Sequence, residues 1–121
     1  MLIAVWIVSG LLALAFLAAG IMKSTRPYAK TVESMPWAGD FSALQVRAIG
    51  ILEILGAIGL ILPALTGILP VLTPIAAAGL ALIQVGAIIT HVRRKEYKVI
   101  PANAVLLALA LFVAVARFAG V

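Results

Sequence analysis

The sequence predicts an all-α membrane protein, folded as an antiparallel bundle of four transmembrane helices. Of its 121 residues, 65% are hydrophobic and only 11% are charged, which leaves too little polar surface for a soluble domain of this size. Four stretches are long and apolar enough for a helix to cross the hydrocarbon core, which takes about 20 residues. Apolar and polar residues do not alternate along these stretches, so transmembrane strands are excluded.

The first predicted span covers residues 2–22, which contain no charged side chain, and ends at Lys23. It is longer than the roughly 7–15 apolar residues of a signal peptide and has no basic region before it, so we expect it to be retained. The polar connection that follows, residues 23–42, holds two prolines that break any long helix. Its aromatic residues are typical of the headgroup belt, and we expect a short interfacial helix around residues 28–35.

Three further spans follow, separated by two short connections. The first connection is apolar and contains three prolines, beginning with Pro63, which we expect to end the span before it. The second is the basic segment HVRRKEYK, residues 91–98. Because nothing outside the spans could form a soluble core, we expect residues 1–121 to form a single domain. The predicted bounds of these spans are 43–62, 71–90 and 99–118.

Small residues occur in every predicted span. Gly20 lies near the end of the first span, and Gly50, Gly56 and Gly59 lie in the second. In lipid, hydrophobicity does not drive helices together, and small residues allow their backbones to approach closely. We therefore expect a compact four-helix bundle.

Basic residues are distributed unequally between the two sides of this bundle. The connections 23–42 and 91–98 carry seven lysines and arginines, whereas the opposite side carries only Arg117. Basic connections mark the cytoplasmic side of multi-pass membrane proteins. We therefore expect both connections to be cytoplasmic and both termini to lie outside. This distribution also accounts for the net charge of +5 without nucleic-acid binding.

Glu53 is the most unusual residue of the sequence. It lies about ten residues into the second span, close to the midplane of the bilayer. An unpaired carboxylate there costs at least about 2.5–3.5 kcal/mol, so an intramembrane ionisable residue is a candidate for function. Arg47 points about 120° away from it on a helix, so we expect the partner of Glu53 to come from another helix, as Gln84, Lys23 or His91. Polar glue between helices is the structural alternative.

Six residues are therefore candidates for ligand binding, five in the cytoplasmic half of the bundle and Arg117 on the outer side. A spacing of seven places Gln84 and His91 on one helix face, and Asn103 and Arg117 on another. The alternative for Lys23 and Arg117 is an anchoring role at the interface, and His91 has a similar alternative as an interfacial hydrogen-bond partner. The candidates are Glu53, Gln84, His91, Lys23, Asn103 and Arg117.

Several kinds of chemistry are missing from the sequence. It has no cysteine, which excludes disulfides and thiolate metal sites, and a single histidine cannot form a bis-histidine haem site. It also lacks a glycine-rich phosphate loop, a nucleophile elbow and a pair of carboxylates. We therefore expect no metal, no intrinsic cofactor and no catalytic residue, and a protein that is not an enzyme on its own.

Four stretches of the chain resemble the DoxX-like family of small bacterial membrane proteins: AGIMKSTRP, AIGILEILGAIGLILPALTGILPVLTPIAAAGLAL, GAIITHVRRKEY and NAVLLALALFVAVARF. The shared pattern is a lysine after the first helix, a glutamate in the second, a histidine ending the third and an arginine ending the fourth. These are Lys23, Glu53, His91 and Arg117 here. The resemblance implies a four-helix bundle in a bacterial inner (plasma) membrane.

The resemblance implies less about activity. The family takes its name from a subunit associated with a thiosulfate:quinone oxidoreductase, and other members are linked to redox or sulfur stress. Without cysteine, a redox role of this chain would use a bound quinone or the cofactor of a partner.

Three functions are consistent with the sequence. The first is binding of a small apolar or amphiphilic molecule, a quinone or lipid, in a cytoplasm-facing polar cavity around Glu53. The second is a non-catalytic membrane subunit or scaffold, whose basic connections recruit a redox partner protein. The third is a small proton-coupled transporter, which would act as a homo-oligomer because four spans without a detectable inverted repeat are few for a transporter.

Overall fold

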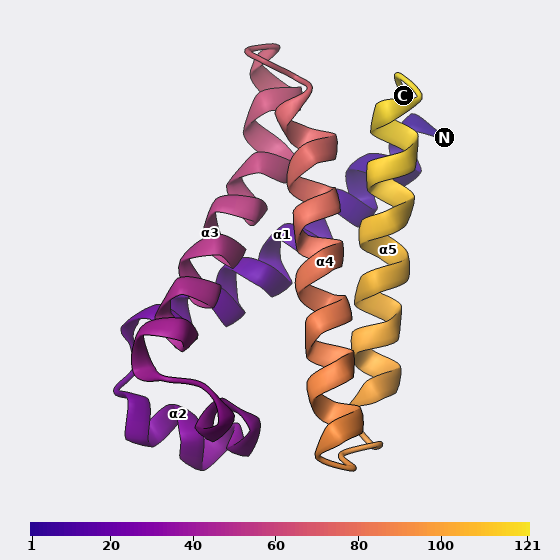
Figure 1. The fold of residues 1–121 in the computed structure, drawn as a ribbon. Helices are drawn as coiled ribbons and strands as arrows, with labels where there is room; N and C mark the ends of the chain where they lie inside the picture. Colours follow the sequence, from indigo (N-terminus) through magenta and orange to yellow (C-terminus); the bar gives the residue numbers. More distant parts are fainter.

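Apart from short connections, all 121 residues of the computed structural model are helical (Figure 1). Four long helices are long and apolar enough to cross a membrane, which confirms the predicted all-helical membrane fold. Two short helices connect the first long helix to the second. The long helices are α1 (Leu2–Thr25), α3 (Ala43–Thr66), α4 (Leu72–Arg93) and α5 (Ile100–Phe118), and the short ones are α2 (Tyr28–Ser34) and the 3₁₀ helix η1 (Pro36–Asp40).

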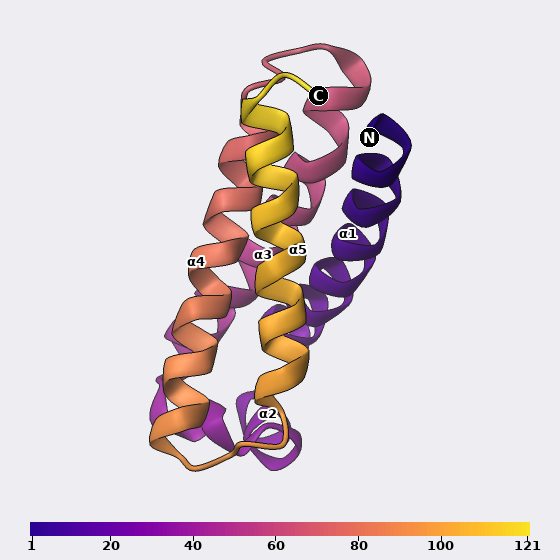
Figure 2. The same cartoon turned by 90° about the vertical axis from the view of Figure 1, so that its right-hand side faces the viewer.

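Consecutive long helices run in opposite senses (Figures 1 and 2). Helix α1 packs mainly against α3, and α4 packs against α5 and α3. Helices α3 and α4 converge at the turn that joins them and spread apart toward the other end, where α2 lies (Figure 1). We call the end that holds α2, η1 and the connection 94–99 the basic end. The opposite end, with both termini and the turn 67–71, is called the terminal end.

The bundle exposes large apolar side chains along its outer surface and has an apolar core between its helices. Large side chains such as Leu44, which is 77% exposed, and Leu82, which is 72% exposed, face outward along the helices. In a membrane such side chains meet lipid, and the helices associate through close packing. The middle of the bundle is filled by a buried core of leucine, phenylalanine, valine and alanine side chains. This core consists of Leu12, Phe16, Ala57, Leu60, Ala77, Leu80, Ala81, Ala110, Val113 and Ala114.

Helices α1 and α3 touch at two glycines, as the small residues of the sequence predict. A Cβ atom added at Gly20 would lie 2.5 Å from the carbonyl oxygen of Gly50. A Cβ atom added at Gly50 would lie 2.7 Å from the carbonyl oxygen of Gly20. Because both obstacles are backbone atoms, neither position accepts a side chain unless the two helices move apart.

The prediction that the second span stops at Pro63 is wrong, because α3 continues through this proline to Thr66. A proline inside a helix removes only its own N–H bond and crowds the carbonyl four residues earlier, that of Gly59. Membrane helices tolerate this disturbance. The helix ends instead where Gly67 adopts a left-handed φ of 73° and donates its N–H to the carbonyl of Pro63 at 3.0 Å.

The connection from α1 to α3 is more structured than the sequence predicts. A short helix, α2, is present where the interfacial helix is expected, and η1 is an additional element. The start of α3 is then fixed by a capping box, in which the Gln45 N–H donates to Ser42 Oγ at 3.1 Å and the Ser42 N–H donates to Gln45 Oε1 at 2.9 Å. Together these elements place η1 against the basic end of the bundle.

Candidate functional site

The carboxylate of Glu53 is held by Lys23. Lys23 Nζ donates to Glu53 Oε1 at 2.7 Å, and the two side chains are only 12% and 2% exposed. Gly20 and Gly50 each lie three residues before one of these side chains, on the same helix face. Side chains lean toward the N-terminus of their helix, so on two helices of opposite sense the two side chains lean toward each other. Of the three partners expected for Glu53, the one observed in the structure is Lys23.

Trp37 of η1 packs over this lysine. Lys23 Nζ lies 5.2 Å from the centroid of its ring, a distance at which cation and ring attract each other. The same ring makes edge-on contacts with Phe41, at 5.8 Å between centroids, and with His91, at 6.3 Å. Trp37 therefore joins η1 to side chains of α1 and α4.

Lys23 and Trp37 both line a cavity of about 530 Å³ at the basic end of the bundle. This volume lies within the range of small-molecule sites, which combine apolar walls with a few convergent polar groups. Its polar lining includes Lys23, Gln84, Thr90, His91, Arg93 and Asn103, and its apolar lining includes Met35, Trp37, Phe41, Ile49, Ile83 and Ala87. Glu53 is not among the lining residues and is connected to the cavity through Lys23.

Gln84 is the polar residue of this lining that the protein itself leaves unsatisfied. Its side chain is 5% exposed, and its Oε1 atom is buried without a hydrogen-bond partner. A buried polar atom without a partner costs about 1–3 kcal/mol. A group that donates a hydrogen bond to this oxygen would remove this cost.

His91 is oriented by a carboxylate. Its Nδ1 atom lies 3.0 Å from Glu96 Oε1. An ionised carboxylate only accepts hydrogen bonds, so Nδ1 carries the proton and Nε2 of the neutral ring is left as an acceptor. The hydrogen bond from His91, supported by one from Arg94, holds the pKa of Glu96 below its ordinary value.

An ion pair fastens η1 to the connection between α4 and α5. Arg94 Nη1 donates to Asp40 Oδ1 at 2.9 Å, and Arg94 Nε lies 3.3 Å from Glu96 Oε1. The hydrogen bond to Asp40 is the main reason why the pKa of Arg94 is raised. A second pocket of about 540 Å³ lies beside this ion pair and shares Trp37, His91, Met35 and Asn103 with the cavity. Trp37 and His91 thus form part of a wall that the two spaces have in common.

Comparison with known proteins agrees with the resemblance seen in the sequence. The model of the DoxX-like family matches residues 7–113. The chain belongs to the DoxX-like family. No curated protein and no solved structure matches it. The matched region includes Lys23, Glu53 and His91, whereas Arg117 lies beyond it.

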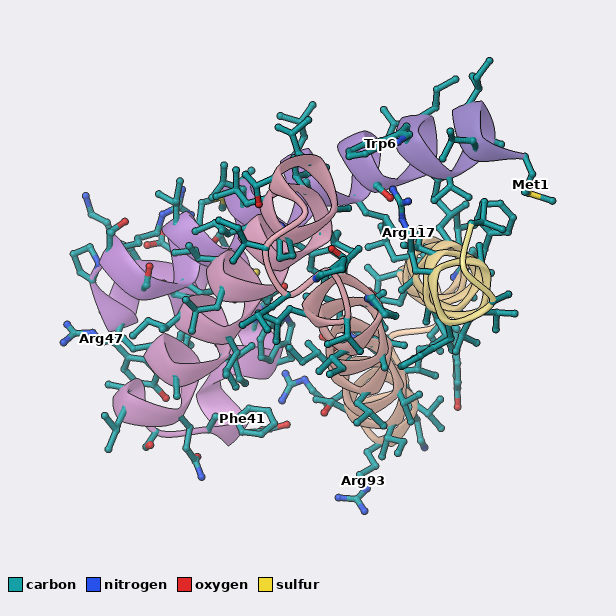
Figure 3. All side chains as sticks on the ribbon, turned by 90° about the horizontal axis from the view of Figure 1, so that it is seen from above. Met1, Trp6, Phe41, Arg47, Arg93 and Arg117 are labelled. Carbon is teal, nitrogen blue, oxygen red and sulfur yellow. The ribbon has the colours of Figure 1, made fainter.

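The DoxX-like protein brings four of its six candidate residues to one cavity. Glu53 belongs to this group through its lysine partner. Arg117 lies apart at the terminal end, where its guanidinium carbon is 4.8 Å from the centroid of the Trp6 ring (Figure 3). Arg47, which was expected not to pair with Glu53, points away from the bundle (Figure 3). The four residues that line the cavity are Lys23, Gln84, His91 and Asn103.

The sequence does not predict the contribution of the connection 23–42 to this site of the DoxX-like protein. Trp37 and Phe41 line the cavity, and Asp40 pairs with a residue 54 positions away in the chain. No helical period relates these residues to α4, because η1 and the turns around it separate them. The one available signal was the aromatic content of a short polar connection, which is equally typical of the headgroup belt.

Proposed function

We propose that this DoxX-like protein binds a small amphiphilic molecule, a quinone or a lipid, in the cavity at its basic end. The observation that carries the proposal is the buried Gln84 side chain, which has no partner in the protein and lines the cavity together with Lys23. In this proposal Gln84 and Lys23 bind the polar head of the molecule, and the apolar lining holds its hydrocarbon part. Glu53 holds the lysine in position and compensates its charge.

The cavity lining offers both hydrogen-bond donors and acceptors, which fits a head group that both donates and accepts hydrogen bonds. An ammonium group has three N–H donors, and Lys23 uses one of them for Glu53. The others remain for a carbonyl or an anionic oxygen. Gln84 Oε1 and His91 Nε2 are acceptors for a hydroxyl group. A carbonyl and a hydroxyl on one small head group would use both kinds of partner.

The orientation predicted from the sequence belongs to the same proposal. Lysines and arginines of both basic connections gather at the basic end, whereas Arg117 lies in the last turn of α5 at the other end. With the basic end in the cytoplasm, the cavity lies in the inner half of the membrane. An amphiphile of the inner leaflet would then have its polar head near the aqueous side.

The buried core makes transport the weaker alternative. Side chains such as Phe16, Leu60 and Leu80 fill the middle of the bundle and are almost completely buried. They separate the polar groups of the basic end from those of the terminal end. A scaffold role, in contrast, depends on the exposed basic residues and is independent of Gln84.

Analysis of bound small molecules tests this proposal. The protein is purified in mild detergent, and its extract is analysed by mass spectrometry for the wild type and for Gln84→Leu. The matched control is Val85→Leu, the next residue, whose side chain faces outward. We expect one class of amphiphile in the wild type and the control, and a loss of roughly five- to twelvefold in Gln84→Leu, because a hydrogen bond to a buried group is worth about 1–1.5 kcal/mol. An extract without any reproducible molecule, or an unchanged amount in Gln84→Leu, would refute it.

A further inference from the structure

His91 lies between two spaces at the basic end. It lines the cavity of about 530 Å³, together with Lys23, and it also lines the second pocket of about 540 Å³. The His91 ring and Lys23 Nζ both contact the ring of Trp37, at 6.3 and 5.2 Å from its centroid. A small head group that packs against Trp37 in the cavity is therefore within reach of an imidazole and of an ammonium group.

The imidazole of His91 is arranged to accept a proton. Nδ1 lies 3.0 Å from Glu96 Oε1 and donates to it, which leaves Nε2 as the basic nitrogen. Nε2 makes no hydrogen bond in the protein, and it is not sealed off as Gln84 Oε1 is. Because the pKa of Glu96 is held below its ordinary value, this carboxylate is ionised at neutral pH and stabilises a positively charged ring. A histidine oriented by a carboxylate through Nδ1 has the arrangement of a general base.

The charged groups that face His91 favour an anion beside it. Four cations line the two spaces, and Glu96 is the only carboxylate in either lining. Glu53 compensates the charge of Lys23, but the other three cations remain. Helices α2, η1 and α5 add no charged side chain to either lining. The four cations are Lys23 of α1, Arg93 of α4, and Lys95 and Lys98 of the connection 94–99.

We propose that His91 takes the proton of an acidic hydroxyl group of the ligand, and that this ligand is a hydroxyaromatic molecule held as its anion. The O–H bond of the ligand breaks, the proton moves to Nε2, and the electron pair stays on the oxygen, which is stabilised by Lys23. No oxidant or further reactant takes part. This inference rests on the proposed function and narrows it. A ring with a hydroxyl group, such as the reduced form of a quinone, has this proton, whereas the phosphate of a phospholipid is already ionised.

A nitrophenol tests this step, because its anion absorbs visible light and its neutral form does not. Para-nitrophenol is mixed with the protein in detergent at a mildly acidic pH, where the free probe is mostly neutral, and the absorbance of the anion is followed. Quenching of Trp37 fluorescence in a Trp6→Phe background reports binding separately, since the chain has two tryptophans. We expect saturable quenching, and a ratio of anion to neutral probe at least roughly tenfold above that in empty micelles.

Variants of His91 and of its carboxylate separate binding from ionisation. His91→Gln keeps a hydrogen-bond acceptor but not a base, so we expect it to bind the probe and to lose the excess of anion. Glu96→Gln should lower the ratio of anion to neutral probe roughly threefold, the effect of a partly exposed ion pair. The matched control is Val92→Gln, at the exposed position next to His91, which should change neither signal.

The outcomes distinguish this inference from the proposed function. Should His91→Gln fail to fold, Glu96→Gln decides the result. Quenching by a probe that stays neutral, or an unchanged anion ratio in the deciding variant, overturns the proton transfer and leaves the binding function in place. The absence of quenching overturns the choice of a hydroxyaromatic ligand, while the binding function is decided by the extract of Gln84→Leu.

Discussion

Lys23 reaches Glu53 because three features of the sequence coincide. Both residues follow a glycine by three positions, the two helices run in opposite senses, and the two glycines touch. The sequence alone identifies Glu53 as a carboxylate that needs a partner and restricts that partner to three residues. It does not determine which helix faces meet, because the nearly all-apolar helices have no distinct polar side. The choice of Lys23 therefore depends on packing that only the structure shows.

Removing one member of this pair should destabilise the protein more than removing both. Lys23→Met leaves a buried carboxylate without its cation, which typically costs about 3–5 kcal/mol. The double variant Lys23→Met/Glu53→Gln has no uncompensated charge and should regain most of that loss. Thermal or denaturant unfolding in detergent of the wild type, both single variants and the double variant measures the coupling. Additive effects of the two substitutions would show that the pair contributes nothing.

The ion-pair cluster around Glu96 should make the basic end sensitive to acid. Because His91 and then Arg94 hold the pKa of Glu96 below its ordinary value, the unfolded connection binds more protons than the folded one over that range. Its stabilisation is therefore complete well above about pH 4.3, the ordinary glutamate value, and is lost as the pH falls through and below it. The protection of the amides of residues 94–99 against hydrogen exchange, measured relative to the intrinsic rate at the same pH, should fall on acidification. Glu96→Gln should exchange faster at neutral pH and lose most of this pH dependence.

At the scale of the elements, the sequence predicts the helices better than the connections. All four long helices and α2 follow from runs of apolar residues and from prolines in the polar connection. The end of α3 does not, because a proline near the end of a membrane helix disturbs only one turn. The sequence also does not predict η1 or the ion pair between Asp40 and Arg94. Both depend on contacts between segments 54 residues apart.

The contact between α1 and α3 should be intolerant of a single methyl group. Gly20→Ala places a Cβ atom 2.5 Å from a backbone oxygen, so the helices must separate, at a cost of about 1–3 kcal/mol. Gly10→Ala in the same helix meets nothing within 4 Å, and we expect it to be neutral or to stabilise by up to about 1 kcal/mol. Unfolding of both variants in the same detergent makes the comparison. Equal stability of the two would exclude this contact as the determinant of the α1–α3 packing.

For the whole molecule, the structure separates two polar regions by an apolar core. The cavity and the basic residues lie at one end, and Arg117 with Trp6 lies at the other. The sequence predicts this division well, because a helical rise of 1.5 Å per residue converts position along a span into depth. It cannot predict the shape of the cavity, which depends on how far α3 and α4 spread and on where η1 packs.

The proposed orientation can be tested with single cysteines, because the natural chain has none. We expect Ile68→Cys, in the exposed turn at the terminal end, to react with a membrane-impermeant thiol reagent in intact cells or right-side-out vesicles. Lys98→Cys, at the basic end, should react only after the membrane is permeabilised. The opposite labelling pattern would show that the protein has the opposite orientation, with the cavity in the outer leaflet.

The central claim is that the cavity at the basic end holds a ligand, and two glycines of α4 test it most directly. A Cβ atom added at Gly86 or at Gly79 meets nothing within 4 Å, but Gly86 lines this cavity whereas Gly79 lines a groove between α3 and α4. Both substitutions to leucine are expected to fold, and only Gly86→Leu reduces the space for a ligand. The decisive measurement is native mass spectrometry of the wild type, Gly86→Leu and Gly79→Leu after identical purification. We expect a bound amphiphile in the wild type and in Gly79→Leu that is lost in Gly86→Leu. Equal retention in both variants would contradict ligand binding in this cavity.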